Sequence, residues 1–356
     1  MESLDERKGE ILKAIVRAYV RDGEPVGSKR LLRETGLGVS AATVRADMAA
    51  LEDAGFIAQP HTSAGRIPTD KGYRYFVDTL SGTATLSPEQ RAALEGLLRG
   101  SSDLEELLRR TSGILSRLTR FAALVVAPRL DRSRVRHVEL VWLGATSVLA
   151  VVIADTGRVE KRMLDLEVPV IEHDVGRARY AVNDALAGLP LTQAPEVLAG
   201  LAAGAPQEVR TVIEAVAKAV RGGLDAPQYE QLFVGGTANI AVSGYFNRIE
   251  QVQQVYETLE EQVIVLQMLR DALDTGDPAV RIGAELPLVE LAACSIVAAS
   301  YDAVGGAEGS LGVLGPSRMD YPRTLAAVQA VASSLEKALA DLVGGRASPP
   351  TRPGLN

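Results

Sequence analysis

Arg45 is the one long cation on a face of a predicted helix whose other side chains are small. Small side chains let a helix approach a surface closely, and a guanidinium can donate two parallel hydrogen bonds to O6 and N7 of guanine. The amides of the first helical turn, with Ser40 and Thr43, could also bind a phosphate group. The alternative is an alanine-rich helix that carries Arg45 as a solvated charge. The face comprises Ala41, Ala42, Thr43, Arg45, Ala46 and Ala49.

A second polar group follows between two short apolar runs. Residues 60–65 are rich in types that form turns, and Arg66 comes directly after them. At the tip of a hairpin these side chains would meet a sugar-phosphate backbone or a minor groove, and the alternative is a plain polar hairpin. The group consists of His61, Thr62, Ser63 and Arg66, and Ser28 and Lys29 of an earlier short helix complete the predicted contacts.

Apolar spacing predicts three helices that would position these groups. The first ends at Asp22–Gly23, because glycine tolerates a left-handed residue at the end of a helix. The second is short, with Ser28 as its predicted N-cap and a stop at Gly36, and Ser40 caps the third. The inward stripe of the third helix is Val44, Met48 and Leu51.

A short strand from Phe56, the polar loop and a return at Ile67 complete the pattern. Three helices followed by a hairpin are typical of a winged helix-turn-helix, which places one helix in the major groove of DNA and the hairpin beside it. The hairpin therefore favours a contacting role for Arg45 over a solvated one.

The charge distribution agrees with this interpretation. The 356 residues carry a formal net charge of −7, which at first speaks against a nucleic-acid partner. Residues 1–80, however, hold 12 Lys and Arg against 12 Asp and Glu, and the remainder holds 26 against 33. Positive charge is concentrated in residues 27–45 and 59–75, and a local patch can attract DNA to an acidic chain.

Beyond residue 80 the pattern predicts a mixed domain after a linker at 81–85 and a helix at 88–98. The amphipathic stretch 103–122 is either a coiled-coil seam or a helix buried on the sheet of its own domain, and the spacing leaves both open. Strands are predicted within 123–166 and 280–314, helices within 174–222 and 246–273, and a closing helix at 321–343.

No constellation for catalysis or metal binding stands out. His61, His137 and His173 have no ligand spacing between them, and Cys294, the one cysteine, cannot build a zinc site alone. The run 234–237 resembles a fragment of a phosphate loop but lacks its Gly-Lys-Ser/Thr. We therefore expect no cofactor, no metal and no enzymatic activity.

The apolar stretch 138–154 contains Glu139 and a break at Gly144–Ser147, which favours a β-hairpin over a membrane span. No basic segment followed by an apolar run opens the chain. We therefore expect a cytoplasmic protein that does not enter a membrane.

Residues 40–57 and 59–74 closely resemble the family of heat-inducible transcription repressors HrcA, and the runs 232–240 and 312–321 resemble it too. The resemblance implies an α+β multidomain chain, in which a GAF-like α/β domain with a mostly helical inserted dimerising segment follows the winged helix-turn-helix. The expected limits are 1–80 for the DNA-binding domain, 81–102 for a linker and helix, 103–343 for the GAF-like domain with an insertion at about 167–245, and 344–356 for a disordered tail.

We therefore expect a homodimeric repressor, because two-fold protein symmetry matches an inverted-repeat operator in double-stranded DNA. The resemblance implies a CIRCE-type operator of heat-shock (chaperone) genes, relief of repression on heat stress and modulation by the chaperonin. Two alternatives belong to other classes: a regulator whose GAF-like pocket binds a small molecule, and a protein-interaction module whose winged helix contacts protein.

Overall fold

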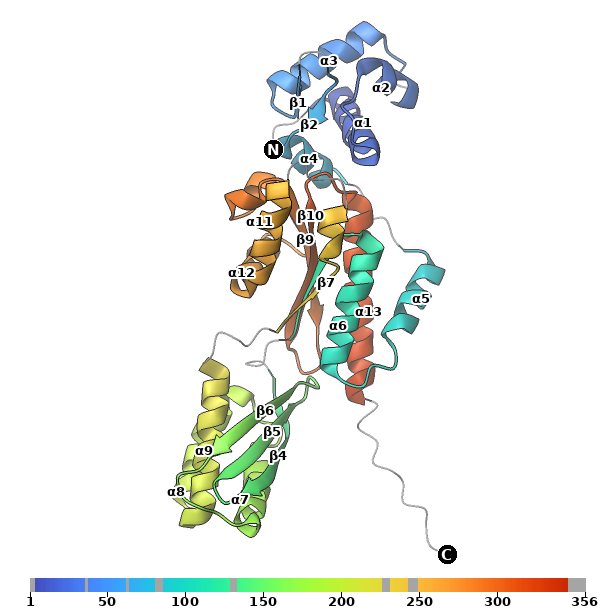
Figure 1. The fold of residues 1–356 in the computed structure, drawn as a ribbon. Helices are drawn as coiled ribbons and strands as arrows, with labels where there is room; N and C mark the ends of the chain where they lie inside the picture. Colours follow the sequence, from blue (N-terminus) through green and yellow to red (C-terminus); the bar gives the residue numbers. More distant parts are fainter. Residues whose placement is uncertain are drawn as a thin grey trace, which may run out of the picture.

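A computed structural model describes residues 4–35, 38–61, 64–80, 86–128, 133–225, 231–242 and 249–344. The fold is a mixed α+β arrangement in three parts that follow one another along the molecule (Figure 1). We call residues 4–80 the N-terminal unit, residues 133–225 the inserted unit, and the described residues 86–128 and 231–344 the body. The predicted linker at 81–85 and residues 345–356 of the predicted tail lie outside the described residues.

The N-terminal unit has the predicted helices and hairpin. Asp5, Ser40 and Thr69 cap three of its helices, each accepting a backbone N–H three residues on, and Gly23 ends the first helix at φ 76°. Ser28 is the first residue of its helix instead of the cap, because Gly27 O accepts the amides of Arg30 and Leu31. The elements are α1 (Glu6–Asp22), α2 (Ser28–Thr35), α3 (Ala41–Asp53), β1 (Ile57–Ala58), β2 (Ile67–Pro68) and α4 (Asp70–Asp78).

The body is built on an antiparallel sheet with helices on both faces. The strand order is β7-β3-β10-β9-β8. Its strands are β3 (Ala122–Val126), β7 (Leu232–Gly235), β8 (Ala279–Ile282), β9 (Cys294–Asp302) and β10 (Glu308–Pro316). Its helices are α5 (Pro88–Leu98), α6 (Leu104–Thr119), α10 (Ala238–Val242), α11 (Ile249–Glu260), α12 (Gln262–Leu273) and α13 (Tyr321–Gly344), and short 3-10 turns cover Gly283–Glu285 and Val289–Leu291.

Helix α6 packs within its own body. It lies beside α13 against β3 and β7, with Leu107, Leu108 and Leu115 buried, while α11 and α12 cover the opposite face of the sheet (Figure 1). Of the two interpretations left open by its spacing, the structure favours the helix buried on its own sheet. Helix α5 packs outside α13 and has the predicted bounds.

The inserted unit has a separate three-stranded antiparallel sheet of order β4-β5-β6. Strands β4 (Val135–Gly144) and β5 (Ser147–Ala154) form the hairpin predicted for the apolar stretch, and β6 (Val159–Asp165) adds the third strand. One face of this sheet is buried under the helices α7 (Glu172–Leu186), α8 (Ala194–Ala203) and α9 (Gln207–Asp225), with a 3-10 turn at Leu191–Gln193 between α7 and α8.

The inserted unit does not coincide with the insertion expected at about 167–245. Strands β4 to β6 precede residue 167 yet share a hydrophobic cluster with α7 to α9, whereas β7, inside the expected range, pairs with β3 of the body. Spacing shows that a segment is a strand, but not which sheet it joins. No helix of the described residues is long and apolar enough to cross a bilayer.

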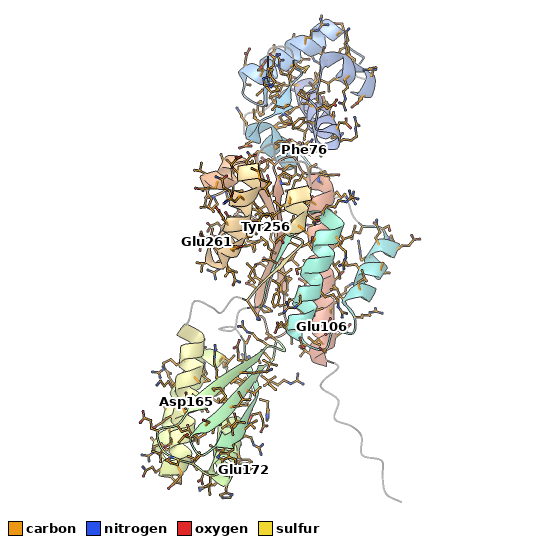
Figure 2. All side chains as sticks on the ribbon, viewed as in Figure 1. Phe76, Glu106, Asp165, Glu172, Tyr256 and Glu261 are labelled. Atoms are coloured by element: carbon orange, nitrogen blue, oxygen red, sulfur yellow. The ribbon has the colours of Figure 1, made fainter. Side chains whose placement is uncertain are left out.

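The N-terminal unit is fastened to the body through α4. The rings of Tyr73 and Tyr321 lie 5.8 Å apart, and Phe76 is buried in the same hydrophobic cluster (Figure 2). Arg74 Nε donates to Glu285 Oε1 at 2.7 Å, and Asp70 accepts the amide of Ala284 at 3.0 Å. Burial would lower the pKa of Arg74, but the Glu285 carboxylate outweighs burial and raises it.

Candidate nucleic-acid interface

Helix α3 has one buried and one exposed face. Val44, Asp47, Met48 and Leu51 point into the N-terminal unit, as the predicted inward stripe requires. The exposed face consists of Ala42, Arg45, Ala46 and Ala49, which recur every three or four residues and so lie on one side of the helix. In Figure 1, α3 lies at the end of the molecule away from the body.

Arg45 is the cation of this face. No hydrogen bond or ion pair joins its guanidinium to any residue that the structure describes. Three methyl side chains surround it, so the helix backbone can come close to an opposing surface. Ser40 and Thr43 are already joined, with Ser40 Oγ accepting the Thr43 amide at 3.1 Å and the two hydroxyls 2.9 Å apart.

An ion pair between an exposed arginine and a buried aspartate fixes α3 against α1. Arg7 donates from Nε and Nη2 to the two oxygens of Asp47, at 2.8 and 3.0 Å, and Asp47 is 4% exposed. This hydrogen bonding raises the pKa of Arg7. The fork geometry of guanidinium and carboxylate sets the orientation as well as the separation of two groups, so it sets the rotation of α3 about its axis.

The hairpin is built as predicted in its strands. Ile57 pairs with Pro68 and Ala58 with Ile67, and the Ala64 amide donates to His61 O at 2.9 Å. His61 is exposed beside this turn. Thr62 and Ser63 lie outside the described residues, so their predicted contacts stay predictions.

Arg66 is engaged inside the unit. Its Nε and Nη2 both donate to Glu52 Oε2, at 2.8 and 2.7 Å, and its backbone exchanges two hydrogen bonds with Val26. The side chain therefore ties the hairpin to the last turn of α3, and the backbone ties it to the loop before α2. A phosphate would have to compete with Glu52 for this guanidinium.

Pairing also reduces the positive patch expected from the sequence. Arg30 bonds to Asp22 and Glu34, and Arg21 bonds to Glu34 as well. The Arg30 hydrogen bond lowers the pKa of Glu34. Lys29 and Arg33 are exposed and, in the described part of the chain, have no ion-pair partner, whereas Ser28 is half-buried.

Sequence reasoning missed Arg7, Asp47 and Glu52. The position of Asp47 could have been used to predict an ion pair. Its carboxylate lies on the buried stripe of Val44, Met48 and Leu51, and a buried charge needs a hydrogen-bonding partner. Which cation supplies that partner depends on how α1 crosses α3, and spacing along the chain does not contain that information.

The face of the body sheet opposite α6 and α13 is closely packed near Cys294. The cavity beside it, lined by Phe121, Ile240, Val255 and Leu314 among others, measures about 10 Å³, roughly the smallest space that holds one water. Burial raises the pKa of the Cys294 thiol to about 12. This cavity therefore has no room for an effector.

Comparison with known proteins gives the chain its class and family. The family model described as HrcA protein C terminal domain matches residues 105–325. Three relatives carry the name heat-inducible transcription repressor HrcA. The one from Acidothermus cellulolyticus is 48% identical and covers 95% of this chain and 99% of its own length. That from Frankia casuarinae is 47% identical, covering 92% and 97%, and that from Thermobifida fusca is 46% identical, covering 95% and 97%.

A crystal structure of a hypothetical protein has a TM-score of 0.65 at 21% identity and covers 96% of this chain and 100% of that one. This likeness supports the fold alone. The class that the sequence relatives define is the transcription repressor. Within that class, the chain belongs to the HrcA family of heat-inducible transcription repressors.

Proposed function

We propose that the N-terminal unit is a winged helix-turn-helix that binds double-stranded DNA, with α3 in the major groove and Arg45 as its base-contacting side chain. The observation that carries the proposal is the exposed face of α3, where one guanidinium without a partner in the described part of the chain stands among alanines. Helices that enter the major groove contact base edges with a few side chains of one face. The chain is then a regulator without catalytic activity, acting in the cytoplasm where the chromosome lies.

Lys29, Arg33 and His61 supply contacts with phosphates in this proposal, together with Ser28, Ser40, Ala41, Thr43 and the hairpin residues Thr62 and Ser63. Arg66 holds the hairpin beside α3 through Glu52. Phosphate contacts fix the register of a protein on DNA without specifying a sequence. Specificity therefore rests on α3.

We further propose that the inserted unit joins two chains. One face of its sheet is uncovered, and Val141, Leu149 and Met163 form an apolar row across the three strands on that face. Met163 is 56% and Val141 is 40% exposed. An exposed apolar sheet face is typical of a protein interface, and a homodimer would place two α3 helices on an inverted repeat.

The body is, in this proposal, a GAF-like domain, and its closely packed face near Cys294 argues against the small-molecule regulator that binds an effector there. The proposed limits are residues 4–80, the body, and an insertion at residues 133–225. Following the family resemblance, we propose a CIRCE-type operator and modulation by a chaperonin.

Fluorescence anisotropy of the full chain tests this function. Labelled duplexes would carry an inverted repeat, one half-site or a scrambled repeat, and each would be titrated before and after heating the protein. We expect strong preference for the full repeat, because a dimer engages its second half-site at a high effective concentration, and loss of binding after heating. Equal affinity for all three duplexes would contradict sequence-specific dimeric binding.

A further inference from the structure

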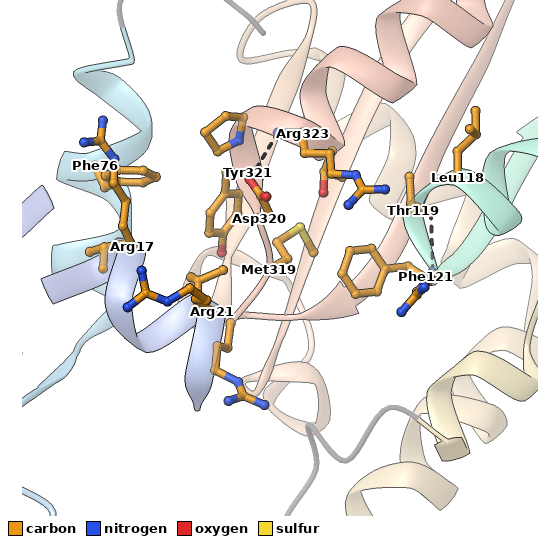
Figure 3. A pocket seen from close by; sticks show the side chains of 16 residues that line it. Arg17, Arg21, Phe76, Leu118, Thr119, Phe121, Met319, Asp320, Tyr321 and Arg323 are labelled. Carbon is orange, nitrogen blue, oxygen red and sulfur yellow. Dashed lines mark hydrogen bonds between the residues drawn. The ribbon is translucent and has the colours of Figure 1, made fainter. Parts of the chain in front are cut away.

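A cavity of about 610 Å³ lies where the N-terminal unit meets the body. Its walls come from the last turns of α1, the end of α6, and the segment 318–324 that leads into α13. Figure 3 shows Arg17 and Arg21 on one side of it and Phe121 and Arg323 on the other. The volume lies within the range of small-molecule sites, and the proposed DNA contacts use none of these residues.

The walls of this cavity are strongly basic. Five arginines line it, namely Arg17, Arg21, Arg120, Arg318 and Arg323. Asp320 is the one acid among the lining residues, and its carboxylate already accepts the Arg323 amide at 3.2 Å. A chain of net charge −7 thus gathers a local excess of cations away from α3.

Most of these guanidiniums are not neutralised by carboxylates. Arg21 pairs with Asp22 and Glu34, and Arg318 lies over the Tyr19 ring at 5.7 Å. Arg17, Arg120 and Arg323 have no ion pair with any residue in the described ranges, although Arg17 lies 6.0 Å from the Phe76 ring centre. Like charges that line one cavity without counter-charges favour an anionic occupant.

Arg120 also occupies an unfavourable backbone position. It ends α6 with φ 62°, where glycine is usual, and it is the one non-glycine residue with positive φ among those described. Backbone conformations of this kind cluster at ligand-binding sites. A glycine at this position would adopt the conformation easily but would add no charge to the cavity wall, whereas Arg120 adds a guanidinium there.

We propose that this cavity binds a phosphate chain, that is, a molecule with two or more linked phosphates. The guanidinium fork matches phosphate oxygens. Three lining arginines without an ion pair in the described ranges, beside one lining aspartate, match a polyvalent anion better than a single carboxylate. The occupant would contact Arg17 of the N-terminal unit together with Arg120 and Arg323 of the body, and so would link the two. A nucleoside triphosphate and inorganic polyphosphate share this chemistry.

Isothermal titration calorimetry and thermal unfolding of the full chain test the proposal with inorganic tripolyphosphate and with ATP. The cavity variant is Arg17→Gln, Arg120→Gln and Arg323→Gln combined. The matched control removes three exposed arginines outside the cavity, Arg91→Gln, Arg117→Gln and Arg221→Gln. Each lost charge-assisted hydrogen bond should weaken binding about ten- to a hundredfold.

We expect saturable binding and a raised melting temperature for the native chain and the control, and loss of both for the cavity variant. Equal affinity for the two ligands would assign the site to the phosphate chain alone, and tighter ATP binding would assign it to a nucleotide. Absence of binding, or equal binding to the cavity and control variants, overturns the proposal.

Operator binding without added anion separates this proposal from the function proposed above. Both triple variants should bind the inverted repeat equally. If the cavity variant alone lost DNA affinity, the arginines would contact DNA phosphates, which overturns the phosphate-chain site and leaves the DNA-binding function intact.

Discussion

Replacing Arg45 with alanine isolates base recognition from folding. Arg45 is exposed and unpaired among the described residues, and it lies in the interior of α3. Alanine is the best helix former, and surface substitutions away from special features usually change stability by less than about 0.5 kcal/mol. Urea unfolding of Arg45→Ala should therefore match the native chain, so any change in DNA binding arises at the interface.

The expected loss of binding follows from the number of contacts. One bidentate pair between arginine and guanine contributes about 1 to 3 kcal/mol of discrimination. A homodimer presents two copies of α3, so Arg45→Ala should weaken binding to the full repeat by about 2 to 6 kcal/mol, which is about thirtyfold or more. Binding to a scrambled duplex should fall far less, because at most one phosphate contact per subunit is lost there.

The assay is anisotropy on the repeat and on its scrambled form at one salt concentration. The matched control is Arg33→Ala, which removes an exposed cation of α2 that has no ion-pair partner in the described ranges. Arg33→Ala should weaken binding to the repeat and to the scrambled duplex alike, and it should reduce the slope of log affinity against log salt concentration. If Arg45→Ala keeps the native ratio between the two duplexes, α3 does not use this side chain to distinguish bases.

Three further outcomes test the surrounding structure. Arg66→Ala and Glu52→Ala should each lower the free energy of unfolding by about 0.5 to 1 kcal/mol. The double variant should lose little more stability than either single variant, because both remove the same ion pair. Additive losses would show that the two side chains are uncoupled. Tyr73→Phe should raise the free energy of unfolding by about 1 kcal/mol, because the buried Tyr73 hydroxyl has no hydrogen-bond partner among the described residues; an unchanged or lower value would reveal a partner. Val141→Lys combined with Met163→Lys should give a monomer in sedimentation and at least tenfold weaker binding to the full repeat, while Tyr180→Lys on the exposed side of α7 should stay dimeric.

Local structure was predictable wherever it depends on residues close together in the sequence, such as helix caps and turn residues. Ser40 caps the helix that follows it, and Gly23 adopts the left-handed conformation expected at a helix end. The hairpin followed from turn residues between two short apolar runs. Strand membership was not predictable, because the residues of a strand do not show which sheet it completes, and β3 and β4 follow one another along the chain but belong to different sheets.

Charge was the least predictable property, because its effect depends on pairing across long sequence separations. Counting cations placed Arg66 and Arg74 on the DNA-contacting surface, yet Glu52 and Glu285 engage their guanidiniums. The same count could not bring Arg17 and Arg323 to one cavity, since they are some 300 residues apart. Once paired side chains are set aside, the remaining cations of the described residues include one group around α3 and one at the junction with the body. The first group suits DNA, and the second lies where an anion would set how firmly the N-terminal unit is held.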